Sequence, residues 1–282
     1  MSASTKKKLA IILGGGGMSS SYSVGFLKAI KNTYKIQPDI LIAASGSAGT
    51  ASYFLTSDFT KAVRRIWLKE ILSPEFISGK GLYKKVNIDY LIDIIFKEKI
   101  TLKTKEVMLN PTSLYIPAID SKTGLIHYFS NRDINTNWMD VLRATKAIPI
   151  FYNKEVSIGN KKYHDSHKSA HPENHINFAK KQGATHVIVV HNTSITGFWE
   201  SKILEYFWFR KYKSKEFLKR YRENYEGTLT EHYIRIEPSR RPFANILDTK
   251  KEDIQETIAM GYTDARQNKK LKKFLQDFNQ TK

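Results

Sequence analysis

The sequence contains no cysteine. This absence excludes disulfide bonds, thiolate metal sites and a cysteine nucleophile. The chain also lacks an apolar run near the roughly 18 residues that a membrane-spanning helix needs, and the apolar stretch Leu9–Leu13 is too short for the core of a signal peptide. We therefore expect a protein that is cytoplasmic, or secreted without a cleavable signal peptide, and that meets a membrane only peripherally.

Acidic residues are scarce relative to basic ones. The 282 residues include 46 Lys and Arg against 27 Asp and Glu, which gives a formal net charge of +19. A charge of this size favours an acidic partner, either nucleic-acid phosphate or anionic lipid headgroups. A hydrophobic content of 41% is sufficient for a sizeable core and excludes a wholly disordered chain.

Strand and helix patterns alternate along the chain. Leu9–Leu13 and Asp39–Ala44 are predicted as buried strands that flank a helix at Ser21–Asn32, which makes a βαβ unit with parallel strands. The alternation continues and predicts a single α/β domain over residues 1–282 with a mainly parallel sheet. The further strands are expected at Ser113–Ile119, Ile126–Ser130, His186–His191 and His232–Ile236, and the further helices at Ala48–Ser57, Thr60–Ile71, Trp138–Ala147, Ile176–Gln182 and Asp253–Arg266.

The segment Phe198–Tyr225 interrupts this alternation because it is long, aromatic and basic. One interpretation is a helical region that packs its aromatic side chains into the core and exposes its charges. Another is an interfacial surface whose aromatic residues enter lipid headgroups while its lysines meet anionic lipid. Stacking on nucleic acid is the weakest of the three interpretations, since no known nucleic-acid motif accompanies the segment.

Four consecutive glycines, Gly14 to Gly17, follow the first predicted strand. Such a loop can turn several N–H groups toward one point, and the helix that follows adds positive potential, so an anion is the expected ligand. A Walker loop is excluded because Gly17 is followed by Met18-Ser19-Ser20. The dinucleotide fingerprint fits only as Gly15-x-Gly17 with Ser20 in place of the third glycine. A simple packing turn and a nucleotide site remain as alternatives to an oxyanion hole.

A second loop of small residues follows the second predicted strand. A serine on a sharp turn between a strand and a helix is exposed at its tip, and small flanking residues relieve the crowding. Ser47 is the predicted nucleophile, with an elbow made by Ser45, Gly46, Ala48 and Gly49. If the two strands are adjacent and parallel, both loops lie at the same edge of the sheet, which places glycine N–H groups near a serine hydroxyl.

A carboxylate that could act as the base is Asp165, in the histidine-rich stretch Lys161–Pro172. With it, three motifs appear in the order of the patatin-like phospholipase family, which this chain resembles. The glycine-rich loop at Leu13–Ile30, the elbow at Ser45–Ser52 and the Asp loop at Tyr163–His167 correspond to the family's motifs. The resemblance runs from about residue 9 to 190 and includes two supporting segments, Leu142–Asp165 and Ala179–Val190.

The resemblance implies a three-layer α/β sandwich with a mainly parallel central sheet and a serine lipid acyl hydrolase of phospholipase A type. It implies that Ser47 attacks the ester, that Asp165 moves the proton, and that Gly15, Gly16 and Gly17 supply the oxyanion hole. No metal or other cofactor is implied. The expected partners are phospholipid or another acyl-ester lipid and an anionic membrane surface, with no nucleic acid.

The chain departs from the family's motifs at five positions. They are Ser19, Ser20, Ser45, Ser166 and His167. A second hypothesis is therefore a catalytically degenerate patatin-fold protein that binds anionic membrane or a partner. An active enzyme with these changes could require a protein activator.

Four histidines near Asp165 are spaced by three, four and four residues: His164, His167, His171 and His175. A metal site is a minor alternative, because Pro172 and small polar neighbours indicate a loop rather than a helix. His191 is a further candidate, as the histidine of a Ser–His–Asp triad, although a buried or capping role fits it better.

Overall fold

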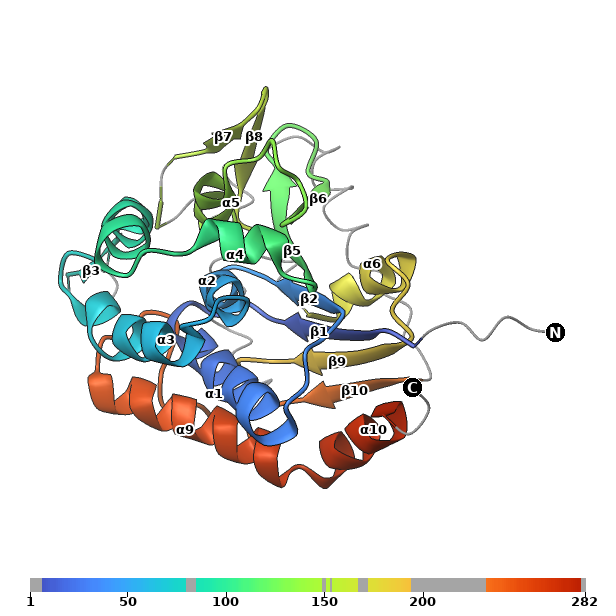
Figure 1. The fold of residues 1–282 in the computed structure, drawn as a ribbon. Helices are drawn as coiled ribbons and strands as arrows, with labels where there is room; N and C mark the ends of the chain where they lie inside the picture. The colour runs from blue at the N-terminus through green and yellow to red at the C-terminus, as the bar shows by residue number, and fades with distance from the viewer. Residues whose placement is uncertain are drawn as a thin grey trace.

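A computed structural model describes residues 7–79, 85–148, 151–152, 154–166, 172–193 and 232–279. The predicted segment Phe198–Tyr225 lies outside the described residues, as do His167 and His171. Within the described part the strands alternate with helices, as the sequence predicts (Figure 1). The α-helices are α1 (Ser21–Ala29), α2 (Gly46–Phe54), α3 (Phe59–Leu68), α4 (Thr104–Leu109), α5 (Trp138–Ala144), α6 (Ile176–Lys181), α9 (Lys251–Gln267) and α10 (Lys269–Asn279), and the ten-residue segment η5 (Tyr90–Lys99) is a π-helix.

The central sheet has eight strands in the order β10-β9-β1-β2-β5-β8-β7, with β6 paired to β5. The pairs among β10, β9, β1, β2 and β5 are parallel, whereas β6, β7 and β8 add antiparallel pairs. A separate hairpin pairs β3 with β4. The strands are β1 (Leu9–Leu13), β2 (Ile40–Ala43), β3 (Ile77–Ser78), β4 (Lys85–Val86), β5 (Ser113–Asp120), β6 (Ile126–Ser130), β7 (Val156–Ile158), β8 (Lys161–His164), β9 (His186–Val190) and β10 (Tyr233–Ile236).

Strand β1 is buried on both of its faces. Leu9, Ile11 and Leu13 pack into the larger core, whereas Ala10 and Ile12 face the smaller one on the other side of the sheet. This follows from the two-residue period of a strand and explains why its sequence is continuously apolar. Helices α1, α2 and α9 cover one face, and α6 lies over the other (Figure 1).

The predicted βαβ unit is confirmed. Strands β1 and β2 pair in parallel, with Leu13 opposite Ala43 at their carboxyl ends. The glycine loop and the serine loop therefore leave the sheet at the same edge, side by side. Only small shifts separate the expected elements from the observed ones: α2 begins at Gly46, two residues before the predicted start at Ala48.

Candidate active site

The turn between β2 and α2 contains a strained residue, and that residue is Ser45. Its backbone has φ 49° and ψ −118°, a combination that a residue with a side chain rarely adopts. Such strain costs on the order of 1–3 kcal/mol and concentrates at functional sites. The strand ends at Ala43 and the helix starts at Gly46, so Ser45 occupies the tip of the elbow.

Ser47 lies two residues further on, inside the first turn of α2, and its side chain is buried. The Ser47 hydroxyl donates to the carbonyl oxygen of Gly14 at 2.6 Å and accepts from Nδ2 of Asn192 at 3.0 Å. Asn192 also bonds the carbonyl of Gly15 and, through Oδ1, the hydroxyl of Ser23 at 2.6 Å. Ser47 therefore belongs to a buried polar network that holds the glycine loop in place.

Asp165 follows β8 and is also buried. Burial raises the pKa of its carboxyl group to about 7, and a hydrogen bond from the side chain of Ser45 and the positive charge of Lys146 partly oppose that rise. Its Oδ2 atom has no hydrogen-bond partner among the residues that the structure describes. The structure thus brings Asp165 together with Ser45, and no described hydrogen bond joins it to Ser47.

The glycine loop turns sharply beside the elbow, with positive φ angles at Gly16 and Gly17. In the part of the chain that the structure describes, the N–H groups of Gly15 and Gly16 make no hydrogen bond. Gly46 fits tightly against this loop: a Cβ atom there would lie 2.5 Å from the carbonyl oxygen of Gly17. The loop and the elbow therefore pack in direct contact, and only glycine is tolerated at residue 46.

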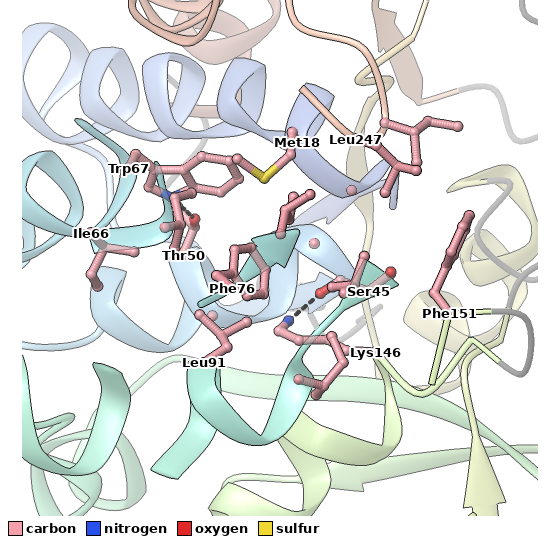
Figure 2. Close-up of a pocket in the computed structure, with 18 of the residues that line it drawn as sticks. Met18, Ser45, Thr50, Ile66, Trp67, Phe76, Leu91, Lys146, Phe151 and Leu247 are labelled. Carbon is pink, nitrogen blue, oxygen red and sulfur yellow. Dashed lines mark hydrogen bonds between the residues drawn. The ribbon is translucent and has the colours of Figure 1, made fainter. Parts of the chain in front are cut away.

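A largely apolar pocket opens beside Ser45 (Figure 2). A concave, mostly apolar space with a few polar groups at one side is typical of small-molecule sites. Ser45 and Lys146 lie on one side, and Ile66 and Trp67 of α3 lie at the far end. Gly17 and Gly46 also line the pocket, whereas Ser47 does not. The apolar lining is Met18, Tyr53, Val63, Ile66, Trp67, Ile71, Phe76, Ile77, Val86, Ile88, Leu91, Phe96, Ile148, Phe151, Ile246 and Leu247.

Three consecutive residues after α5 tie the elbow to Asp165. The hydroxyl of Thr145 accepts from the N–H of Ser45 at 3.0 Å. Lys146 donates through Nζ to the carbonyl oxygen of Ser45. The carbonyl of Ala147 accepts from the N–H of Asp165 at 3.1 Å. The segment therefore fixes the backbone of both candidate residues at once.

The remaining histidines have other contacts. Nδ1 of His175 bonds the Tyr128 hydroxyl at 2.8 Å, and Nε2 of His191 bonds Glu173 at 2.8 Å. Among the described residues no cluster of three or more His, Asp or Glu side chains is arranged to hold a metal ion. No helix in the described ranges combines the length and apolar character that crossing a bilayer requires.

Sequence reasoning missed two residues of this region, Lys146 and Asn192. Lys146 is a single charge between small and apolar neighbours in Ala144-Thr145-Lys146-Ala147-Ile148, which is a detectable sign of a buried cation. Asn192 directly follows β9, so its place at the carboxyl edge of the sheet was the available signal.

A mainly parallel α/β sheet with this elbow and glycine loop at its carboxyl edge places the protein among those with a lipid-hydrolase fold. The family model described as patatin-like phospholipase matches residues 11–166, more than half of the chain. The protein belongs to the patatin-like phospholipase family, as its sequence motifs predict.

Known proteins that are similar to the chain include one curated relative and one solved structure. An uncharacterized protein of Escherichia coli K12, YjjU, is 26% identical over 191 residues, which is 65% of this chain and 51% of YjjU. The chain thus spans about half the length of this relative. A crystal structure of VipD from Legionella pneumophila superposes with a TM-score of 0.56 at 11% identity and covers 97% of this chain and 67% of VipD. At this identity the likeness shows the fold alone.

Proposed function

We propose that the protein is a serine lipid acyl hydrolase, an esterase of phospholipase A type, with Ser45 as the nucleophile and Asp165 as the base. One observation carries the proposal: the strained Ser45 opens onto the apolar pocket and bonds the buried Asp165. This assignment moves the nucleophile two residues from Ser47, because Ser47 is buried in the network around Gly14 and does not line the pocket.

The raised pKa of Asp165 suits it to this role. A carboxylate of ordinary basicity is a weak base toward a serine hydroxyl, and a pKa of about 7 makes it a stronger base that is still about half ionised at pH 7. In the first step Asp165 takes the proton of the Ser45 hydroxyl as the serine oxygen forms a bond to the ester carbonyl carbon. The ester carbonyl oxygen then becomes an oxyanion.

The glycine loop is the proposed oxyanion hole. The N–H groups of Gly15 and Gly16, which bond no described residue, and those of Gly17 and Gly46 at the pocket wall are the proposed donors to the developing charge. Each such donor is worth about 3 kcal/mol of barrier in other acyl hydrolases. When the tetrahedral intermediate collapses, the bond to the leaving alkoxide breaks and Asp165 returns its proton to that oxygen.

Water completes the reaction. With Asp165 again acting as the base, a water molecule attacks the acyl-enzyme and releases a fatty acid and free Ser45. The apolar pocket, which ends at Ile66 and Trp67, fits an acyl chain. We propose a phospholipid or another acyl-ester lipid as the substrate, reached at an anionic membrane surface to which the charge of +19 would attract the protein.

Hydrolysis of a fluorogenic acyl ester by three variants tests the assignment. Ser45→Ala and Asp165→Asn should each lower kcat/KM by about 10³-fold or more, since each removes a reacting group. Ser47→Ala should keep most of the activity, with a loss of about tenfold or less, because it only loosens the glycine loop. Retained activity in Ser45→Ala would sink the proposal.

A catalytically degenerate binding protein remains the alternative, favoured by Ser166 and His167 in the Asp loop. That alternative predicts equally low rates for the wild type and all three variants under conditions where each is folded.

A further inference from the structure

Lys146 is a buried lysine that takes no part in the proposed reaction steps. Its side chain is only 7% exposed, yet it lines the pocket beside Ser45 (Figure 2). Burying a lysine is costly unless its ammonium group finds partners. Its described hydrogen bond goes to the carbonyl oxygen of Ser45, the residue whose backbone is strained.

The position of Lys146 relates it to both members of the proposed dyad. It lies between Thr145, which binds the N–H of Ser45, and Ala147, which binds the N–H of Asp165. The negative charge of Asp165 acts on Lys146, and the positive charge of Lys146 acts on Asp165. An ammonium group so placed contacts the elbow and stabilises the base.

We propose that Lys146 is a positioning residue of this site, whose ammonium group fixes the carbonyl of Ser45 and keeps the Asp165 carboxylate ionised. The inference rests on the proposed dyad. Lys146 forms no bond to substrate in this role; it acts through the two residues that do.

The charge of Lys146 is itself sensitive to pH. Burial lowers the pKa of its ammonium group to about 7, and the negative charge of Asp165 opposes that fall. The pKa of Asp165, raised by burial to about 7, is held down by Lys146 in return. Lowering the pH protonates Asp165, and raising the pH removes the charge of Lys146. The productive pair, an ammonium group beside a carboxylate, is therefore populated most near neutral pH.

The test is the pH profile of kcat/KM for the wild type, Lys146→Met and Lys146→Arg with a soluble acyl ester. In Lys146→Met the carboxyl group of Asp165 loses its positive neighbour. The pH at the midpoint of the acid limb should therefore rise by about one pH unit or more. The variant should then be about tenfold slower than the wild type at pH 6.5 and approach it at pH 9, where the wild-type lysine is neutral. Lys146→Arg should keep the acid limb of the wild type and lose the alkaline limb.

Lys146→Met is a fair variant because a buried lysine replaced by an apolar side chain of similar size is expected to fold at least as stably, which thermal unfolding will check. The inference is overturned if folded Lys146→Met has the acid limb of the wild type, or is slower by the same factor at every pH. Absence of hydrolysis by the wild type is a different outcome, since it rejects the proposed function itself.

Discussion

At the scale of single residues, two serines two positions apart have opposite surroundings. Ser45 precedes α2 and takes the strained conformation at the tip of the elbow, whereas Ser47 is one half-turn further along and points into the protein. Ser45 has a non-helical backbone outside α2, whereas Ser47 follows the helix, so the two side chains take different directions. The choice between them therefore depends on where the helix begins.

The raised pKa of Asp165 leads us to expect a pH-dependent effect on the free energy of unfolding. Because its pKa is raised in the folded state, from 3.8 to about 7, the folded protein holds this proton more tightly than the unfolded chain. The stabilising contribution is present below the unfolded value of 3.8 and is lost as the pH rises through about 7. Asp165→Asn should raise the free energy of unfolding by roughly 1–2 kcal/mol at pH 8.

Urea unfolding at two pH values measures this effect. The gain from Asp165→Asn should disappear near pH 4, where the wild-type carboxyl group is neutral in the folded protein. An equal gain at both pH values would show that packing, and not the charge of Asp165, is responsible.

At the scale of elements, helices α1 and α9 cross closely because each has a glycine at the contact. A Cβ atom on Gly25 would lie 2.0 Å from the carbonyl oxygen of Ile258, and one on Gly261 would lie 2.1 Å from that of Tyr22. Helix propensity alone would favour alanine over glycine by about 1 kcal/mol. The steric overlap of an added Cβ atom is unfavourable, and it outweighs this gain in helix propensity.

Gly25→Ala should therefore lower the free energy of unfolding by about 2–3 kcal/mol, as overpacked sites do. Gly159→Ala is the control: its chain neighbours aside, no atom of the described residues lies within 4 Å of its Cβ position, although its φ is +60°. It should cost only about 1 kcal/mol of backbone strain. Denaturation midpoints measure both changes, and a Gly25→Ala variant as stable as the wild type would contradict the close crossing.

Much of the arrangement of elements could be predicted from the sequence. The parallel β1–β2 pair and the common edge of the two loops follow from local periodicity and from the geometry of a βαβ unit. The exact elbow residue could not be predicted in the same way, since Ala44, Ser45, Gly46 and Ser47 are all small and permit several turn positions. Long-range contacts, such as that of Lys146 with Ser45, leave no periodic signal in the sequence.

At the scale of the whole molecule, the pocket gives the proposed substrate its length limit. Its far wall is made by α3, where Ile66 and Trp67 face inward while Arg64 is exposed. Filling that end should shorten the space open to an acyl chain without touching Ser45.

Ile66→Trp should shift the preference from long acyl chains to short ones, by about tenfold in the ratio of kcat/KM values, because a few methylene contacts are lost. A series of esters of increasing chain length provides the measurement. Arg64→Trp, on the exposed face of the same helix, is the matched control and should leave the preference unchanged. If Ile66→Trp has the chain-length profile of the wild type, the acyl chain does not occupy this pocket.

The most direct measurement concerns the residue that becomes covalently modified. A fluorophosphonate reacts with an activated serine, and trypsin would release both candidates in one peptide, Ile36–Lys61. Fragmentation between residues 45 and 47 assigns the adduct by mass. We predict that the adduct lies on Ser45 and is absent from Asp165→Asn, whereas an adduct on Ser47 would contradict the proposed nucleophile.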